Sequence, residues 1–283
     1  MNSKIIKLGI IGRTNTGKST LINSLIGETI SIENKKVNTT VVSIRGILNV
    51  KNTQLIFYDT PGMNFLKSKE LFQKKIRTEL WDSVNHVDLI LYIIDSNRYN
   101  FNIIQNDITK INEIKKPIIF LFNKIDLVDQ KKIYKYIEEI DKFNIVTDFF
   151  NISAKNKTNL NLLVNFLISK AKFGNKIFNQ DEITDKDDIF ISNECTRNSI
   201  LKFLHKEIPY NINIKNITYK ILNKNNIKIK QSIEISNKRY KPIILGKQGE
   251  LIKKIREYSQ SEIEKILNSK IHLYLNIDII NDK

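Results

Sequence analysis

The 283-residue sequence contains one cysteine, one tryptophan and four prolines. The single cysteine, Cys195, excludes an internal disulfide and has no companion for a thiolate metal site, so we expect it to fill space in a core. The apolar runs fall short of the roughly 18 residues that a membrane-crossing helix needs. The N-terminus shows no signal-peptide pattern. These absences predict a cytoplasmic protein.

Arginine is also scarce, since it accounts for only seven of the 46 basic residues, while the formal net charge is +16. The excess of lysine, with abundant asparagine and isoleucine, is the bias of an A+T-rich genome, so the total charge is weak evidence for a polyanionic partner. Local charge is more informative, because residues 206–256 hold thirteen Lys and Arg against three acids. Such a segment is typical of nucleic-acid binding, although a solvated charged surface would give the same pattern.

The length and the hydrophobic content of 41% favour two packed domains. We expect the first domain to cover residues 1–173. Residues 174–188, with clustered acids and asparagines, are the expected linker. Residues 189–283 form the expected second domain.

The first domain alternates between strand-like and helix-like segments, which predicts an α/β fold with a doubly wound, mostly parallel sheet. The expected strands cover residues 5–11, 40–50, 53–58, 87–94, 117–122 and 146–150. The expected helices cover residues 20–26, 70–84, 101–114, 131–143 and 159–172. Ligands of such sheets bind at the carboxyl ends of the strands, so the loops that follow strands are the candidate site.

The first of these loops, Gly12-Arg-Thr-Asn-Thr-Gly-Lys-Ser19, fits the pattern G-x-x-x-x-G-K-[S/T]. Between a strand and a helix, this loop aims backbone N–H groups at phosphate oxygens, while its lysine adds a charge and its serine a metal ligand. A purely structural glycine turn is the alternative. The expected nucleotide contacts are Gly12, Arg13, Thr14, Asn15, Thr16, Gly17, Lys18, Ser19 and Thr20.

Three further strand ends carry polar motifs. Asp59-Thr-Pro-Gly62 offers a carboxylate for a Mg²⁺ shell and a glycine N–H for a γ-phosphate, although such a turn alone would usually be structural. Asn123-Lys124-Ile-Asp126 offers a carboxylate that can accept two hydrogen bonds from guanine, a pairing that adenine lacks. Ser153-Ala154-Lys155 offers a backbone N–H for the guanine carbonyl. Each motif alone is weak, but four motifs in this order predict a guanine nucleotide.

This ordered set resembles the first, third, fourth and fifth motifs of the translation-factor class of P-loop GTPases. Val37-Asn-Thr-Thr40 resembles the second motif, in which the later threonine completes the Mg²⁺ coordination. In the alternative interpretation, Thr39 and Thr40 only begin a strand. The resemblance implies GTP or GDP and Mg²⁺ as ligands. It implies that Ser19, Thr40 and Asp59 coordinate the metal. It also implies that Lys18, Thr40 and Gly62 take part in catalysis.

Two positions bear on the rate of hydrolysis. Met63 stands where Ras-like enzymes carry a water-orienting glutamine, and an apolar side chain cannot hold a water, so we expect slow intrinsic hydrolysis. Asn15 resembles the asparagine that helps cation-activated relatives to bind K⁺ near the phosphates. Dependence on K⁺ is therefore a hypothesis.

The second domain is predicted to have the order α-β-β-α-β. A helix covers residues 189–206, strands cover 211–222 and 227–235, a run from residue 243 leads into a helix that ends at about residue 267, and a strand covers 271–277. Gly246-Lys247-Gln248-Gly249 opens the second helix, where glycines let a helix N-terminus approach a single-stranded backbone and the lysine adds charge. A helix cap without a ligand is the alternative. The order resembles a type II KH domain, a smaller α+β fold. The expected RNA contacts are Gly246, Lys247, Gln248, Gly249 and Lys253.

A P-loop GTPase domain followed by one KH domain resembles the bacterial Era family of ribosome-assembly GTPases, over residues 4 to about 280. The resemblance implies a monomeric GTPase that binds 16S rRNA near its 3′ end and assists assembly of the 30S subunit, with peripheral inner-membrane association as a further family property. Val41 and Val42 depart from the family, which usually has basic residues there. The rival hypotheses are a non-catalytic RNA-binding assembly factor that uses GTP as a structural ligand and a tRNA-modification-type GTPase.

Overall fold

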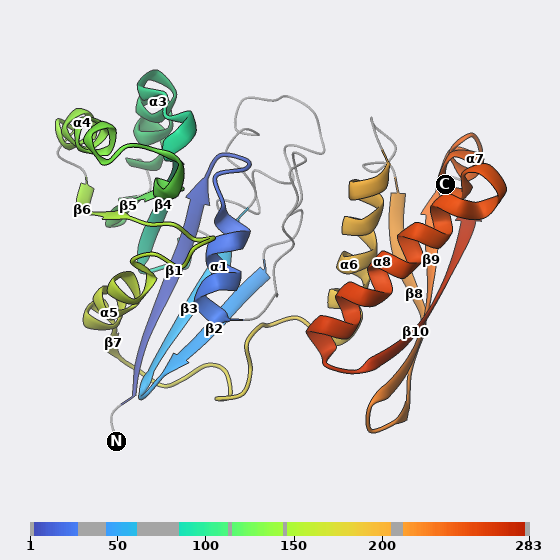
Figure 1. The fold of residues 1–283 in the computed structure, drawn as a ribbon. Coiled ribbons are helices and arrows are strands. Elements are labelled where there is room, and N and C mark those ends of the chain that lie inside the picture. The colour runs from blue at the N-terminus through green and yellow to red at the C-terminus, as the bar shows by residue number, and fades with distance from the viewer. Residues whose placement is uncertain are drawn as a thin grey trace. The chain divides into compact units, whose positions relative to one another are not determined.

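The computed structural model describes residues 3–27, 44–60, 85–112, 115–143, 146–204 and 212–280. The chain divides between Asp185 and Lys186 into two compact units (Figure 1). Each unit has its own sheet and its own hydrophobic core. The prediction of two domains in this order is confirmed.

The sheet of the first unit is mostly parallel, as predicted. Its strand order is β2-β3-β1-β4-β5-β6, and only β2 on this path runs antiparallel to its neighbour. The carboxyl ends of the five parallel strands therefore meet at one edge, which is where the predicted motifs lie. The strands are β1 (Lys4–Gly12), β2 (Ile44–Val50), β3 (Thr53–Asp59), β4 (Leu89–Asp95), β5 (Ile118–Asn123) and β6 (Val146–Asn151).

Helices cover both faces of this sheet, because β3, β4 and β5 are buried along their whole length. One core cluster includes Leu21 and Leu163, from α1 and α5. The other includes Ile104 and Ile133, from α3 and α4. The two pairs of helices thus lie on opposite faces (Figure 1). Their bounds are α1 (Lys18–Ile26), α3 (Phe101–Asn112), α4 (Gln130–Asp141) and α5 (Leu160–Lys170).

Several predicted segments lie wholly or partly outside the described residues. These are the helix over residues 70–84, the first four residues of the strand predicted over 40–50, the last two residues of the helix predicted over 101–114, the last two residues of the helix predicted over 189–206, and the first residue of the strand predicted over 211–222. The motif Val37–Thr40, Gly62 and Met63 also lie outside them.

The segment predicted as a linker packs along the first unit instead of running free. A two-residue strand, β7 (Lys172–Phe173), pairs antiparallel with β1. The side chain of Gln54, fully buried on β3, donates to the carbonyl of Phe178 at 2.9 Å and accepts the N–H groups of Ile177 and Phe178. The N–H of Arg45 on β2 donates to Asp185 at 2.9 Å. Residues 174–185 are therefore part of the first unit, and residue 188 already begins the next helix.

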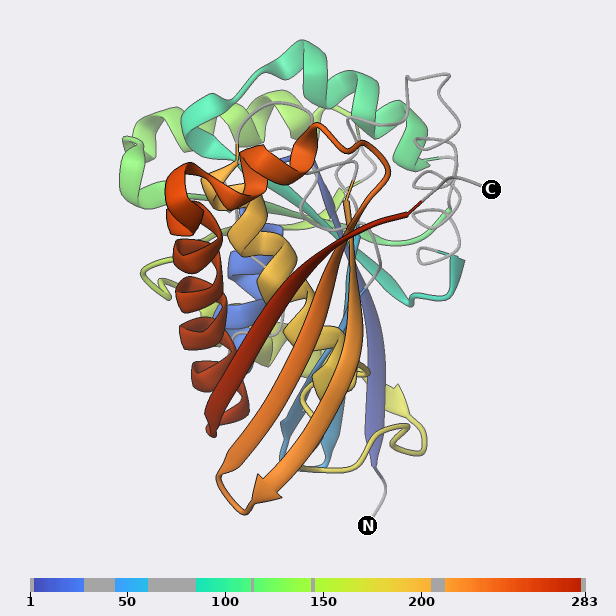
Figure 2. The same ribbon diagram turned by 90° about the vertical axis from the view of Figure 1, so that its right-hand side faces the viewer.

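The second unit packs two long helices on one face of a three-stranded sheet (Figure 2). The sheet order is β10-β9-β8, with β9 and β10 parallel and β8 and β9 antiparallel. Cys195 is buried between helix and sheet, and burial raises the pKa of its thiol to about 12, in line with the predicted core role. The elements are α6 (Asp188–Phe203), β8 (Ile212–Asn223), β9 (Asn226–Ile235), α7 (Tyr240–Leu245), α8 (Glu250–Leu267) and β10 (Lys270–Ile279).

The short helix α7 is an element of the described part of this unit that was not predicted from the sequence. It spans six residues, too few for a periodic pattern, and only Ile244 among them is buried. Among the helices of the described part of the chain, none has the length and apolar character needed to span a membrane.

Candidate functional site

The phosphate-binding loop connects β1 to α1, as predicted. Gly17, which precedes the helix, has φ of +101°, and a Cβ there would overlap the side-chain amide of Asn123. Only glycine accepts both the backbone angle and the close approach. The loop is thereby brought against the end of β5, where the predicted base-recognition motif begins.

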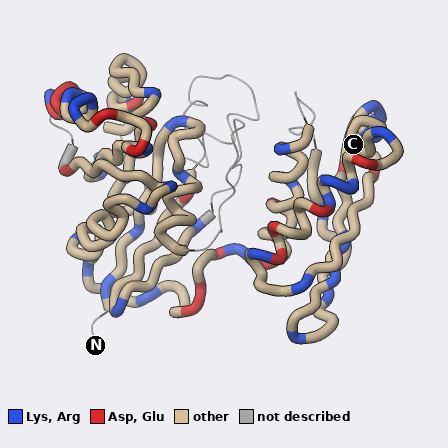
Figure 3. The backbone as a smooth tube through the Cα atoms, viewed as in Figure 1, with Lys and Arg blue, Asp and Glu red and all other residues tan. Residues whose placement is uncertain are grey.

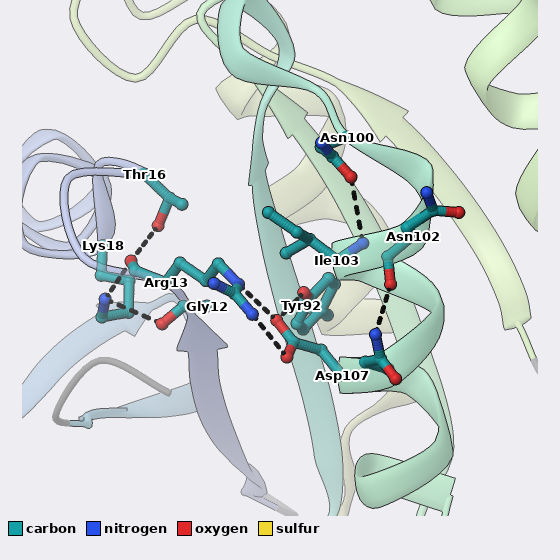
Figure 4. Close-up of polar contacts among 10 residues, drawn as sticks. Gly12, Arg13, Thr16, Lys18, Tyr92, Asn100, Asn102, Ile103 and Asp107 are labelled. Carbon is teal, nitrogen blue, oxygen red and sulfur yellow. Dashed lines mark hydrogen bonds and ion pairs between the residues drawn. The ribbon is translucent and has the colours of Figure 1, made fainter. Parts of the chain in front are cut away.

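Lys18 is buried, and its ammonium group is oriented by the loop itself. Its Nζ donates to the carbonyl oxygens of Gly12 at 3.1 Å and Arg13 at 2.8 Å (Figure 4). Because an ammonium has three N–H donors, one remains for a phosphate oxygen. Burial lowers the pKa of Lys18 to about 8, and the attraction of Asp59 opposes this only in part. A positive charge is thus costly here until an anion arrives.

The two predicted metal ligands in the described residues lie together. Ser19 Oγ donates to Asp59 Oδ2 at 3.1 Å, and Asp59 is fully buried at the end of β3. A hydroxyl and a carboxylate oxygen in contact form the kind of donor set that Mg²⁺ takes. The third predicted ligand, Thr40, and the predicted catalytic Gly62 lie outside the described residues.

Asn123 holds three loops together. Its Nδ2 donates to the carbonyl of Thr16 at 2.8 Å, and its Oδ1 accepts the N–H of Ala154 at 2.9 Å. The side chain is 2% exposed, and its two bonds join the loops after β1 and β6 to the end of β5. The N–H of Ala154 is thus engaged within the protein.

The remaining residues of the base motif lie beside this bridge. Asp126 accepts the hydroxyl of Ser153 at 2.6 Å through Oδ1. Lys124 Nζ donates to the carbonyl of Asn15 at 2.7 Å and to Asp95 at 2.6 Å. The loops after β1, β5 and β6, which hold all the predicted nucleotide contacts except Asp59 and Gly62, therefore form one hydrogen-bonded assembly. Sequence analysis did not find Asp95.

The second residue that sequence analysis missed is Asp107, which pairs with Arg13 from helix α3. The signal was present in the sequence, because Asp107 falls within the apolar stripe formed by Ile104, Ile108 and Ile111. An acid at such a position must find a partner. A cavity of about 160 Å³ adjoins this pair and is lined by Arg13, Thr14, Thr16, Tyr92, Ile93, Ile94, Asp95, Arg98, Asn100, Ile103 and Ile104.

The predicted RNA-binding loop lies between α7 and α8. Gly246 has φ of +70° and ψ of −177°, and a Cβ there would come within 2.5 Å of the Leu251 Cβ, so glycine is required. Lys247, Gln248 and Lys253 are exposed. Lysine and arginine residues recur along β8, β9 and α8 (Figure 3). The loop and its charged surroundings fit the predicted contact with a nucleic-acid backbone.

Comparison with known proteins matches both parts of the chain. The family described as "50S ribosome-binding GTPase" matches residues 7–124, and the family "KH domain" matches residues 201–283. GTPase Era of Rickettsia conorii is 37% identical over 98% of this chain and 81% of its own length. GTPase Era of Rickettsia prowazekii is 38% identical over 98% of this chain and 92% of its own length.

Solved structures agree with these relatives. A crystal structure of Era in complex with MgGDPNP and nucleotides 1506–1542 of 16S ribosomal RNA has a TM-score of 0.87 and 32% identity, and the match covers 99% of this chain and 95% of that one. Aquifex aeolicus Era bound to GDP and AlF₄⁻ has the same TM-score, identity and coverage. The alternation of strands and helices, the four loops and the second unit thus agree with one family throughout. The chain belongs to the Era GTPase family and is a guanine-nucleotide-binding enzyme that hydrolyses GTP.

Proposed function

We propose that this GTPase binds the 3′ region of 16S rRNA through the loop Gly246–Gly249 and assists assembly of the 30S ribosomal subunit. The proposal rests on two features that occur in one chain. The loops after β1, β5 and β6 form one hydrogen-bonded assembly, and a glycine loop in the second unit carries exposed lysines. The similarity to the Era complex with an rRNA fragment supports the choice of RNA.

The proposal includes Mg²⁺ as a cofactor, held by Ser19 and Asp59, with Thr40 as the predicted third protein ligand. The contact between Ser19 and Asp59 fits this role. When bound, Mg²⁺ neutralises charge that develops on the phosphate oxygens. Lys18 adds its remaining N–H to the same oxygens, and Met63 in place of glutamine leaves the attacking water without an orienting side chain.

Activation by K⁺ is part of the proposal at Asn15, a residue with φ of +64° whose carbonyl oxygen is held by Lys124. GTP hydrolysis measured in KCl and in NaCl at equal ionic strength tests it. We expect a faster rate in KCl. Equal rates would exclude a K⁺ site.

The two sites communicate by a shift in population. GTP favours one conformational state of the protein and GDP another. The free energy of RNA binding differs between these two states by a coupling free energy, typically about 1 to 3 kcal/mol. We therefore expect the affinity for the rRNA 3′ fragment to change by roughly 5- to 150-fold between GDP and a non-hydrolysable GTP analogue.

The RNA site is tested by the double variant Lys247→Glu/Lys253→Glu, with Lys265→Glu as control. Lys265 lies on the same helix, about 18 Å along its axis from Lys253. We expect the double variant to lose most of its affinity for the labelled 16S fragment in fluorescence anisotropy while its GTPase activity is retained. Wild-type RNA affinity in the double variant would refute the assignment.

The subunit is tested by sedimentation with purified 30S and 50S particles in the presence of the GTP analogue. The matched family description refers to the 50S particle, whereas our proposal predicts co-sedimentation with 30S. Binding to 50S alone would overturn the proposed role in 30S assembly while leaving the GTPase assignment in place.

We also propose that the protein is a cytoplasmic monomer with peripheral inner-membrane association. Gel filtration coupled to light scattering tests the oligomeric state. Fractionation of cells, with a salt wash of the membranes, tests the location.

A further inference from the structure

A buried carboxylate from helix α3 lies behind the phosphate-binding loop. Asp107 is 2% exposed, although aspartate is almost never buried without a partner. Its Oδ2 accepts Nε of Arg13 at 2.9 Å, and its Oδ1 accepts Nη2 of Arg13 at 3.2 Å (Figure 4). Tyr92 on β4 donates its hydroxyl to Oδ2 at 3.0 Å. Both carboxylate oxygens are engaged, and the two parallel bonds to the guanidinium fix its plane.

Arg13 belongs to the loop, and its carbonyl oxygen is an anchor for two other loop side chains. This oxygen accepts Nζ of Lys18 at 2.8 Å and Oγ1 of Thr16 at 2.9 Å. The direction of the remaining N–H of Lys18 depends on where the carbonyl oxygens of Gly12 and Arg13 lie. A displaced Arg13 peptide would therefore misdirect the N–H that faces the phosphate.

We propose that Asp107 is a positioning residue of the nucleotide site. It holds the Arg13 side chain, and through it the Arg13 peptide, so that Lys18 is oriented before a nucleotide binds. Within the described residues, the hydrogen bonds of the Asp107 carboxylate come from the side chains of Arg13 and Tyr92, so Asp107 acts on the loop through Arg13. The pair joins a buried carboxylate to a guanidinium on a side chain that is 33% exposed. An ion pair of this kind is weak evidence for a role in stability, which is why we assign it to preorganisation of the site.

The proposal is tested by a double-mutant cycle on GDP affinity with the full-length protein. Asp107→Asn and Arg13→Gln, each alone, are expected to weaken GDP binding on the order of tenfold. The double variant is expected to bind GDP as weakly as Arg13→Gln alone, because Asp107 acts only through Arg13. Asp107→Glu is expected to recover part of the affinity, since it restores the charge at a slightly different reach.

A purely structural role is separated from positioning by Tyr92→Phe. This variant removes a buried hydrogen bond to Asp107 but keeps the pair with Arg13, so we expect a lower melting temperature with GDP affinity within about twofold of wild type. The proposal is overturned if Tyr92→Phe weakens GDP binding as much as Asp107→Asn at a similar loss of stability. It is also overturned if the effects of Asp107→Asn and Arg13→Gln add in the double variant.

The Arg13→Gln variant provides a second test if Asp107→Asn does not fold. Arg13→Gln leaves the buried Asp107 carboxylate without its cation, so some loss of stability is expected, and GDP affinity is measured at a temperature where the variant is folded. Unchanged GDP affinity in Arg13→Gln would refute the proposal without any variant at position 107.

Discussion

Nucleotide binding is expected to take up a proton at Lys18, and a change of pH is the perturbation that measures it. In the nucleotide-free protein, burial holds the pKa of Lys18 near 8 rather than at its usual 10.5. Bound phosphates replace the lost solvation with negative charge, so the pKa of Lys18 in the complex rises well above the assay range. At a pH between these two pKa values, Lys18 is protonated in the complex and mostly neutral in the free protein.

The magnitude follows from the pKa of about 8. The neutral fraction of Lys18 in the free protein is about a quarter at pH 7.5 and about three quarters at pH 8.5, and these fractions are the protons taken up per GDP bound. Because GDP binding requires uptake of this proton, the affinity for GDP falls about threefold between pH 7.5 and pH 8.5. In this window the last phosphate proton of GDP is already lost and the guanine N1 proton is still held.

Isothermal titration calorimetry in two buffers of different ionisation enthalpy gives the proton uptake directly. Asp59→Asn, measured with GDP and without Mg²⁺, is a second test, because the loss of the Asp59 charge lowers the pKa of Lys18 further and increases the uptake at pH 7.5. An uptake near zero at pH 8.5, with affinity independent of pH, would show that Lys18 keeps its ordinary pKa and would refute the reasoning.

Three further outcomes follow from single residues. Asp126→Asn keeps an acceptor for Ser153 but replaces an acceptor toward the base with a donor. Competition binding is therefore expected to show a preference for xanthosine over guanosine nucleotides. A variant that still prefers GTP would show that Asp126 does not read the base. Gln54→Ala leaves three backbone groups without their partner and is expected to lower the free energy of unfolding by about 3 kcal/mol in urea titration. A decrease in the free energy of unfolding of less than about 1 kcal/mol would contradict this expectation. Cys195 is buried with its thiol pKa raised to about 12, so we expect a thiol reagent to label it only at the rate of unfolding; rapid labelling of the folded protein would contradict its place in the core.

The fold and most of the site could be predicted because each motif is local. Gly12 to Ser19 directly follows a strand, and the motifs beginning at Asp59, Asn123 and Ser153 each stand at a strand end, so the topology of a parallel sheet brings them to one edge. No contact between distant residues had to be known. The same holds for Gly246 to Gly249, where glycine marks a backbone that other residues cannot adopt.

The parts that could not be predicted depend on contacts between distant residues. Arg13 and Asp107 are 94 residues apart, and nothing in the sequence pairs them. Asn123 was expected to contact the nucleotide, and its two bonds show that it also joins the loops after β1 and β6, a role that only packing decides. The segment after residue 173 has the composition of a linker, yet Gln54, 123 residues earlier, holds it in place.

That segment sets where the two halves of the protein can be separated. A fragment that ends at Phe173 lacks the chain that covers β2 and β3, so the amide of Gln54 and the N–H of Ile47 lose their partners. A fragment that ends at Asp185 keeps both, together with the bond from Arg45. For the same reason, a protease that cuts between residues 174 and 185 damages the GTPase half instead of merely untethering its neighbour.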